Sequence, residues 1–401
     1  MAETLTLRSE RVDDMPLLLA QLDRMGVQRL LDEHFPTHGH WVGLSLGWVT
    51  VVWLPHILSE ADHRLNHVQP WAAQRLHTLR GATGQPVHPL DVSDDRLAAV
   101  LETLRDDARW PALEGAFTQE LLRVYDLQAE RVRLDATTAS GYWRVTADGL
   151  FQFGHSKDHR PDRAQVKSML SVLDPLGVPV ATDVVPGHRA DDPLYLPAVA
   201  RVRESVGRRG LLYVGDCKMA AVETRASLQA GGDFYWCPLS ELQLPPAVLE
   251  GSVEAVAAEP QPLTRITRLT ATGTRQHLAD GFERLEPLTV AGAGEARTWT
   301  ERRLVVRSRQ RARAGERALR ARGKRRFPEL PPLQAAVEAI RTRSRVHGLL
   351  AVQCTERLRK RPLRRYGSRP ATVQVERDVR VKVVVDRPAV ATAIGRLGWR
   401  V

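Results

Sequence analysis

Cysteine is scarce in this 401-residue sequence, which contains only Cys217, Cys237 and Cys354. None of the three forms a Cys-x-x-Cys pair, so neither a disulfide framework nor a thiolate zinc site is expected. Such scarcity is typical of a protein that works in a reducing compartment, and we predict a cytoplasmic location.

Long hydrophobic stretches are missing as well. No run of about 18 uncharged apolar residues occurs, so a membrane span is not expected. The first residues, MAETLTLRSE, lack the basic and apolar regions of a signal peptide. The sequence contains no internal repeat and no low-complexity linker. Its length and its 43% of hydrophobic residues are sufficient for two or three domains with cores of their own.

Positive charge is present in excess, and it is unevenly placed. The formal net charge is +11. Residues 301–401 contain 28 Lys and Arg against 8 Asp and Glu, a net of +20, so residues 1–300 carry −9. A GC-rich genome would favour arginine over lysine, but it would not produce this asymmetry. Because arginine binds phosphate bidentately and stays charged, we expect nucleic acid as the polyanionic partner.

Helical patterns dominate the first part of the chain. Apolar residues recur at helical spacing over residues 15–31, and the apolar residues 43–58 suit a buried helix. Ser93-Asp94-Asp95 has the form of a helix N-cap. We therefore predict a helical N-terminal domain over residues 1–128.

Strand patterns begin near residue 130. Strands are predicted at residues 131–135, 165–173, 178–185, 211–215 and 234–237, and helices at 191–206 and 220–230. Strands that alternate with crossover helices indicate an α/β fold with a mixed sheet. The predicted domains are the first part of this core over residues 129–240, a β-rich and basic insertion over 241–345, and a return to the core over 346–401.

Two aspartates lie where predicted strands end. Asp135 closes the first strand, and Asp216 directly follows the strand at 211–215. Carboxylates on neighbouring strand ends can share divalent cations, since Mg²⁺ binds one or two carboxylates together with waters and phosphate oxygens. A pair of such ions activates the attacking oxygen and stabilises the leaving oxygen in a displacement at phosphorus. A turn or N-cap role is the alternative for either aspartate taken alone.

The residues around these aspartates resemble a known family, the bacterial insertion-sequence transposases of the DDE type. The resemblance is carried by Arg133-Leu-Asp135-Ala-Thr-Thr138, Gly154-His-Ser-Lys-Asp158-His-Arg-Pro161-Asp162, Gly187-His188 and Val214-Gly-Asp216-Cys-Lys218-Met219, with residues 43–47, 59–66 and 94–97 in the helical part. It implies an RNase H-like fold with a β-rich insertion and metal-dependent strand cleavage and transfer in DNA transposition. It also implies Mg²⁺ or Mn²⁺ on Asp135 and Asp216, double-stranded DNA (element ends and target) as partner, and a homodimer on that DNA.

The sequence departs from the family pattern at the third acid. The family has a Glu in a Tyr-x-x-Arg-x-x-x-Glu pattern on a helix after a strand like the one at Trp399-Arg400-Val401, where this sequence ends. We therefore expect a chain truncated before the catalytic Glu, with at most trace strand cleavage. Glu338 is a rival third acid, although its context lacks the Tyr and the Arg. Glu301 and Glu356 are weaker rivals.

Basic residues near the acids and in the C-terminal part are the predicted DNA contacts: Lys157, Arg160, Lys218, Arg309, Arg311, Arg313, Arg325 and Arg326. A solvated loop or a salt-bridged role is the alternative for the first three. Two other functions remain open for the whole chain. One is a DNA-binding remnant or regulator of transposition without catalysis, and the other is an RNase H-type nuclease, which also requires a third acid.

Overall fold

The computed structural model describes residues 9–157, 159–258, 262–290, 296–308, 350–363, 372–385 and 399–401, with the single positions 310 and 335. The chain divides into two compact units, Met1–Cys237 and Pro238–Val401. This division falls close to the predicted boundary at residue 240. The predicted boundary at residue 128 lies inside the first unit, where the chain passes from helix to strand. The predicted domain boundaries all stay predictions.

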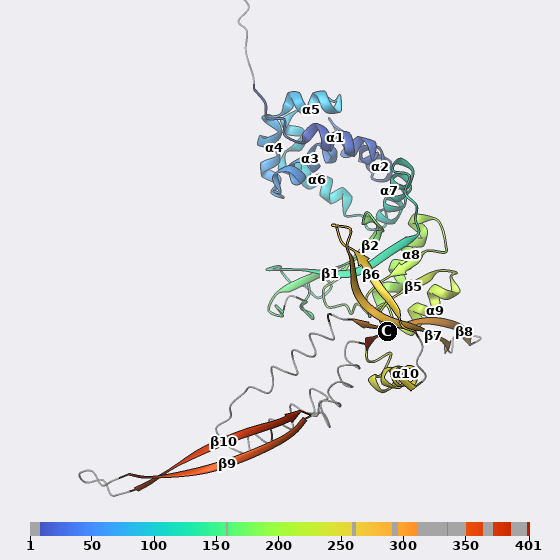
Figure 1. Ribbon diagram of the computed structural model, residues 1–401. Helices are drawn as coiled ribbons and strands as arrows, with labels where there is room; N and C mark the ends of the chain where they lie inside the picture. Colours follow the sequence, from blue (N-terminus) through green and yellow to red (C-terminus); the bar gives the residue numbers. More distant parts are fainter. Residues whose placement is uncertain are drawn as a thin grey trace, which may run out of the picture. The chain divides into compact units, whose positions relative to one another are not determined.

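Helices form the first part of the first unit (Figure 1). They are α1 (Met15–Arg24), α2 (Val27–His34), α3 (Leu46–Glu60), α4 (Leu65–Ala73), α5 (Leu76–Thr83), α6 (Asp94–Leu104) and α7 (Trp110–Val124), with a 3₁₀-helix at Pro89–Val92. The Ser93 side chain accepts a hydrogen bond from the backbone N–H of Arg96 at the start of α6, which confirms the predicted N-cap. Among the described residues, every helix is too short or too polar to cross a bilayer.

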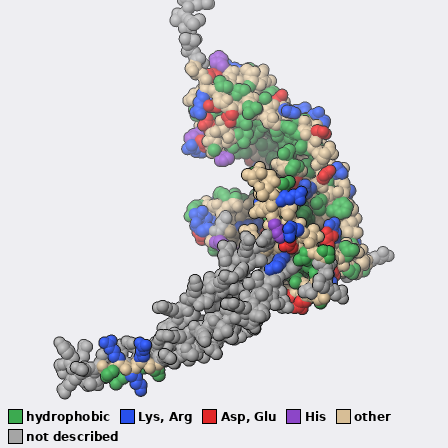
Figure 2. Space-filling model, in the orientation of Figure 1, with side chains coloured by type: hydrophobic (Ala, Val, Ile, Leu, Met, Phe, Trp, Pro, Cys, Tyr) green, Lys and Arg blue, Asp and Glu red, His purple; other side chains and the backbone are tan. Residues whose placement is uncertain are grey.

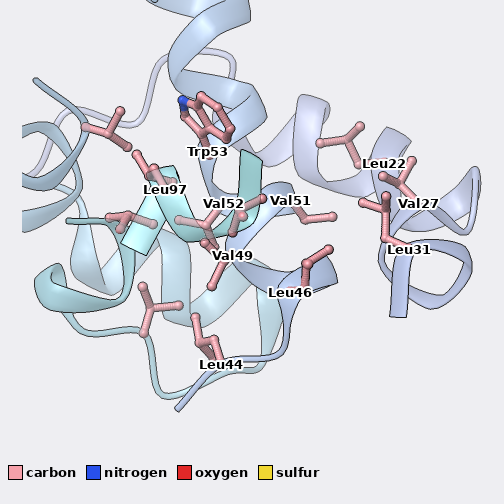
Figure 3. Close-up of a cluster of buried hydrophobic side chains, with 14 of the residues drawn as sticks. Leu22, Val27, Leu31, Leu44, Leu46, Val49, Val51, Val52, Trp53 and Leu97 are labelled. Atoms are coloured by element: carbon pink, nitrogen blue, oxygen red, sulfur yellow. The ribbon is translucent and has the colours of Figure 1, made fainter. Parts of the chain in front are cut away.

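Apolar side chains of these helices form one core. Leu46, Val49 and Val52 of α3 are fully buried, as expected for a helix that is apolar on nearly all sides. Figure 3 shows them in a cluster with Leu97 of α6 and Leu44. Burying an aliphatic side chain of this size stabilises the fold by about 1.5–3 kcal/mol. On the face shown in Figure 2, basic and acidic side chains are intermixed over the helical part.

One histidine is buried in this core. His56 of α3 is 2% exposed and packs edge-on against Trp71, with ring centroids 5.3 Å apart. Burial lowers the pKa of His56, although Asp62 and Glu60 act in the opposite direction. The unfolded chain therefore binds this proton more readily than the folded chain.

We expect the free energy of unfolding to fall as the pH drops below about 6.5, the unfolded value, by up to about 1.4 kcal/mol per pH unit for this one proton. Urea unfolding of the wild type and of His56→Leu at about pH 7.5 and about pH 5.5 measures the effect. The variant should show a flatter pH dependence. Equal pH dependence in the two proteins would contradict the assignment to His56.

A five-stranded mixed sheet follows α7. Its strands are β1 (Arg131–Gly141), β2 (Ala164–Leu173), β3 (Val178–Pro186), β4 (Leu212–Val214) and β5 (Phe234–Trp236). The order across the sheet is β3-β2-β1-β4-β5. β1, β2 and β3 pair antiparallel, whereas β4 pairs parallel with β1, and β5 parallel with β4. This order and these directions are RNase H-like, so the predicted fold class is confirmed.

Crossover helices pack on this sheet. They are α8 (Tyr195–Val206), which follows a 3₁₀-helix at Asp192–Leu194, and α9 (Val222–Ala230). Val199 and Val202 of α8 share a buried cluster with Val132 and Leu134 of β1. The alternation of buried and exposed residues along β1 therefore gives the strand one face for the core and leaves Asp135 on the other.

β1 is longer than predicted. It continues to Gly141, so Asp135 lies within the strand and not at its end. The β-branched residues Thr137 and Thr138 favour extended backbone, and they continue the ladder against Ser168 and Lys167 of β2. The sequence prediction stopped at the acid because a charged residue resembles the end of a hydrophobic alternation.

The second unit contains a four-stranded antiparallel sheet of order β11-β8-β7-β6. Its elements are α10 (Pro246–Ala258), β6 (Thr264–Leu269), β7 (Arg275–Val290), β8 (Arg297–Ser308) and β11 (Trp399–Arg400). Leu249, Val253 and Val256 of α10 pack against Phe282 and Val305 of the sheet. The strand-rich pattern predicted over residues 263–308 is confirmed.

The C-terminal strands differ from the predicted return to the core. β9 (Leu350–Leu363) and β10 (Thr372–Val385) pair with each other along their whole length, and β11 pairs with β8. The alternation of apolar and polar residues predicted the strand at β10, but this pattern could not identify the strand with which β10 pairs. For β9 and β10, pairing with a strand nearby in sequence costs less loop-closure entropy than a return to the distant core sheet. The helix predicted over residues 331–345, with Glu338, lies outside the described residues.

Candidate active site

Asp135 and Asp216 come from adjacent parallel strands. The last residue pair of β1 and β4 is Arg133↔Val214. Asp135 and Asp216 each lie two residues beyond this pair, so the sheet places them at the same level of neighbouring strands. Two carboxylates that are distant in the sequence are thereby brought to one region of the fold.

Asp216 is anchored through one of its two carboxylate oxygens. The hydroxyl of Tyr195, the first residue of α8, donates to Asp216 Oδ1 at 2.7 Å. The backbone N–H of Lys218 donates to the same oxygen at 2.8 Å. Within the described part of the chain, neither a hydrogen bond nor an ion pair reaches Oδ2. One oxygen is therefore held by the protein, while the other remains available to a ligand.

The hydroxyl of Tyr195 is buried and lies against the carboxylate of Asp216. Tyr195 is 1% exposed, and burial is the largest cause that raises its pKa far above the usual value. The hydrogen bond to Asp216 and the charges of Asp216, Asp135 and Asp191 raise this pKa further. The hydroxyl therefore stays protonated at neutral pH and acts as a donor. The hydroxyl contacts Asp216 directly, whereas the charges of Asp135 and Asp191 act on it without a hydrogen bond.

Asp191, the third of these carboxylates, forms ion pairs with two lysines. Its Oδ1 accepts a hydrogen bond from Nζ of the buried Lys167, and its Oδ2 lies 3.6 Å from Nζ of Lys157. Burial acts to raise the pKa of Asp191, but the two lysines outweigh burial and the pKa is lowered. Asp135, in contrast, is exposed, and no ion pair joins it to another described residue.

Two of the predicted DNA-contacting lysines lie beside the acids. Lys157 donates a hydrogen bond to the backbone carbonyl of Ala136, the residue after Asp135. Nζ of Lys218 lies 3.6 Å from Asp192 Oδ1, and the Lys218 side chain is 51% exposed. The structure thus brings Lys157 and Lys218 together with the aspartate pair.

The other predicted DNA contacts are not placed at this site. Arg160 forms an ion pair with Asp162 in the loop between β1 and β2, at 2.6 Å. This pair raises the pKa of Arg160 and lowers that of Asp162 to about 2. The remaining predicted contacts lie outside the described residues: Arg309, Arg311, Arg313, Arg325 and Arg326.

The sequence prediction missed Tyr195, Asp191 and Lys167. The adjacent acids at 191 and 192 before a predicted helix were a usable signal, because acidic residues near a helix N-terminus are often positioned by it. Tyr195 gave no such signal, since a tyrosine at a helix start packs in cores without any special partner. Its role is visible only once α8 is placed beside the end of β4.

Gly215, directly before Asp216, leaves space for this arrangement. A Cβ at this position would lie 2.7 Å from Met219 Sδ and 3.2 Å from Tyr195 Cε1. We expect Gly215→Ala to lower the free energy of unfolding by about 1–3 kcal/mol, because overpacking forces buried side chains to move. Urea unfolding measures this loss. Gly81→Ala, where nothing lies within 4 Å of the added Cβ, is the matched control and should not destabilise. Equal stability of the Gly215 variant and the wild type would contradict the close packing.

The donor set fits a hard divalent cation. Asp135 is exposed without an ion pair, and Asp216 offers Oδ2. Mg²⁺ and Mn²⁺ prefer such carboxylate oxygens, and Mg²⁺ completes its shell with water. Among the residues that the structure describes, no group of three or more His, Cys, Asp or Glu side chains is arranged to hold a metal ion. The site described here therefore offers two protein ligands.

No family model and no curated protein matches the sequence. Among solved structures, the chain is similar to a piggyBac transposase synaptic complex with hairpin DNA, at a TM-score of 0.31 and 12% identity, over 66% of this chain and 59% of that one. It is also similar to a Mos1 transposase paired-end complex with left transposon end. There the TM-score is 0.20 and the identity 12%, over 57% of this chain and 78% of that one. The chain spans less than two thirds of the piggyBac transposase. These likenesses are low, and the fold assignment rests on the strand order.

Proposed function

We propose that this protein is a DDE-type insertion-sequence transposase that acts on double-stranded DNA, with Asp135 and Asp216 as its metal ligands. The observation that carries the proposal is the register of β1 and β4, which places the two aspartates at the same level of adjacent strands. The order of the sheet and the motif residues around both aspartates support it.

The residues around the pair have distinct roles in this proposal. Asp135 and Asp216 would hold Mg²⁺ or Mn²⁺, which supplies Lewis acidity for displacement at phosphorus. Lys157 and Lys218 would hold phosphate oxygens of the strand beside the acids. Contacts that neutralise phosphates without reading sequence are assigned to Arg160, Arg309, Arg311, Arg313, Arg325 and Arg326. The protein would act as a homodimer on the DNA.

A second candidate function is DNA binding without catalysis, as a remnant or a regulator of transposition. The ion pairs of Asp191, the third carboxylate near the pair, favour this function. Asp191 forms them with Lys167 and Lys157, so it is less available to a metal ion. Two available acids hold a metal ion less firmly than three. We therefore propose that strand cleavage by this chain alone stays at a trace level.

Cleavage of a duplex that carries the element ends tests both candidates. The 401-residue chain is incubated with this duplex and Mg²⁺ or Mn²⁺, alongside Asp135→Asn and, as a matched control, Asp148→Asn in the exposed loop after β1. We expect DNA binding by all three proteins and at most trace cleavage. Robust cleavage that only Asp135→Asn abolishes would establish the active transposase. Failure of the wild type to bind the duplex would overturn both candidates.

A further inference from the structure

Asp216 lies beyond the end of β4, where the chain is no longer paired with a neighbouring strand. β4 ends at Val214, and the residues that follow Asp216 form a turn in which the backbone N–H of Met219 donates to the carbonyl of Asp216 at 3.1 Å. No strand pairing fixes the backbone of Asp216 as the β2 ladder fixes that of Asp135. A carboxylate in this position needs other contacts to keep one orientation.

Tyr195 can supply such a contact because its own position is rigid. The ring is buried, and it lies against Gly215, where even an added Cβ would come within 3.2 Å of Cε1. The helix that Tyr195 begins is fixed to the core by Val199 and Val202, which are also buried. The hydroxyl is thus held at a defined point, 2.7 Å from Asp216 Oδ1.

We propose that Tyr195 is the positioning residue of the metal site, and that it turns Asp216 so that Oδ2 faces the cation. This inference rests on the proposed function, in which Asp216 is a metal ligand. The hydroxyl and the backbone N–H of Lys218 both hold Oδ1, which fixes the plane of the carboxylate and keeps Oδ2 free. Hydrogen bonds of this kind orient ligating carboxylates, and their loss typically weakens metal affinity by about 10–100-fold.

Tyr195→Phe tests the proposal, because it removes the hydroxyl and keeps the ring that packs in the core. The matched control is Tyr213→Phe. Tyr213 is also fully buried, and the charges that act on its hydroxyl are those of Asp233, Arg203 and Arg209, and not those of the aspartate pair. In the parallel register Tyr213 pairs with the buried Val132, one position away from the Arg133↔Val214 pair.

The measurements are Mn²⁺ affinity by calorimetry, the electron paramagnetic resonance spectrum of bound Mn²⁺, and the thermal unfolding midpoint without metal. We expect Mn²⁺ affinity about 10–100-fold weaker in Tyr195→Phe, with an altered spectrum, and unchanged affinity in Tyr213→Phe. In an Asp216→Asn background, Tyr195→Phe should have no further effect on Mn²⁺ binding. A purely structural hydroxyl would shift the unfolding midpoint and leave affinity and spectrum unchanged.

The outcomes separate this inference from the proposed function. Wild-type affinity in Tyr195→Phe, together with a loss of binding in Asp216→Asn, would overturn the positioning role and leave Asp216 as a ligand. Wild-type affinity in Asp216→Asn would overturn the ligand assignment, and the positioning role with it.

Discussion

Replacing Arg309, Arg311, Arg313, Arg325 and Arg326 together by glutamine is expected to remove most of the salt dependence of DNA binding. Each phosphate contact contributes about 0.9 to the slope of log affinity against log salt, so five lost contacts should reduce that slope by about 4–5 units. Between about 50 mM and about 200 mM salt, the wild-type affinity should then fall about 500-fold more than that of the variant. Fluorescence anisotropy with a labelled duplex at several salt concentrations measures both slopes.

The control for this experiment lowers the net charge equally at other positions. Five arginines in the helical part are well exposed: Arg11, Arg29, Arg64, Arg105 and Arg123. Their replacement by glutamine should change the salt slope by less than about one unit if residues 309–326 hold the DNA. Similar losses in the two variants would show that DNA affinity depends on overall charge, and that the C-terminal arginines have no special role.

Asp135→Asn and Asp216→Asn are each expected to weaken Mn²⁺ binding by about 100-fold or more. Each variant removes one of the two proposed ligands, whereas loss of a residue that only orients a ligand already costs about 10–100-fold. Thermal unfolding offers a direct reading, since a metal at about 100 times its Kd stabilises the folded state by about 2.7 kcal/mol. At the same metal concentration, this stabilisation should fall to about 0.4 kcal/mol or less in both variants. DNA affinity should be retained, because an acidic group beside the phosphates has been neutralised.

Asp192→Asn separates the loss of a ligand from the loss of any nearby negative charge. Asp192 lies beside the site and pairs with Lys218, but we assign it no metal. It should keep Mn²⁺ affinity within a few-fold of the wild type. A loss as large as that of Asp216→Asn would mean that the cation responds to the total charge of the region, and would remove the specific assignment.

The sequence predicted those parts of the fold that depend on local patterns. The apolar residues 211–215 followed at once by Asp216 predicted a short buried strand with an acid behind it, and β4 confirms this. The turn at residues 174–177 also forms, because Gly177 adopts a positive φ that other residues reach only with strain.

Features that depend on partners distant in sequence were not predictable in the same way. The pattern of β10 indicates a strand, yet the same alternation would serve in any sheet. The identity of its partner β9 comes from the folded chain. Likewise, Asp135 and Asp216 were candidates from the sequence, but the hydroxyl of Tyr195 beside Asp216 depends on how α8 packs against the sheet.

The parallel pairing of β1 with β4 also has a consequence during synthesis. Asp135 leaves the ribosome long before Asp216, and α8 and the strands β2 and β3 are made in between. A nascent chain that ends before β4 can form the antiparallel part of the sheet, but it holds only one of the two aspartates. The pair is complete only after β4 has emerged and docked beside β1. If the pair holds a metal as proposed, tight binding of the cation would begin only once the core has folded, and an unfinished chain would carry no assembled site near DNA.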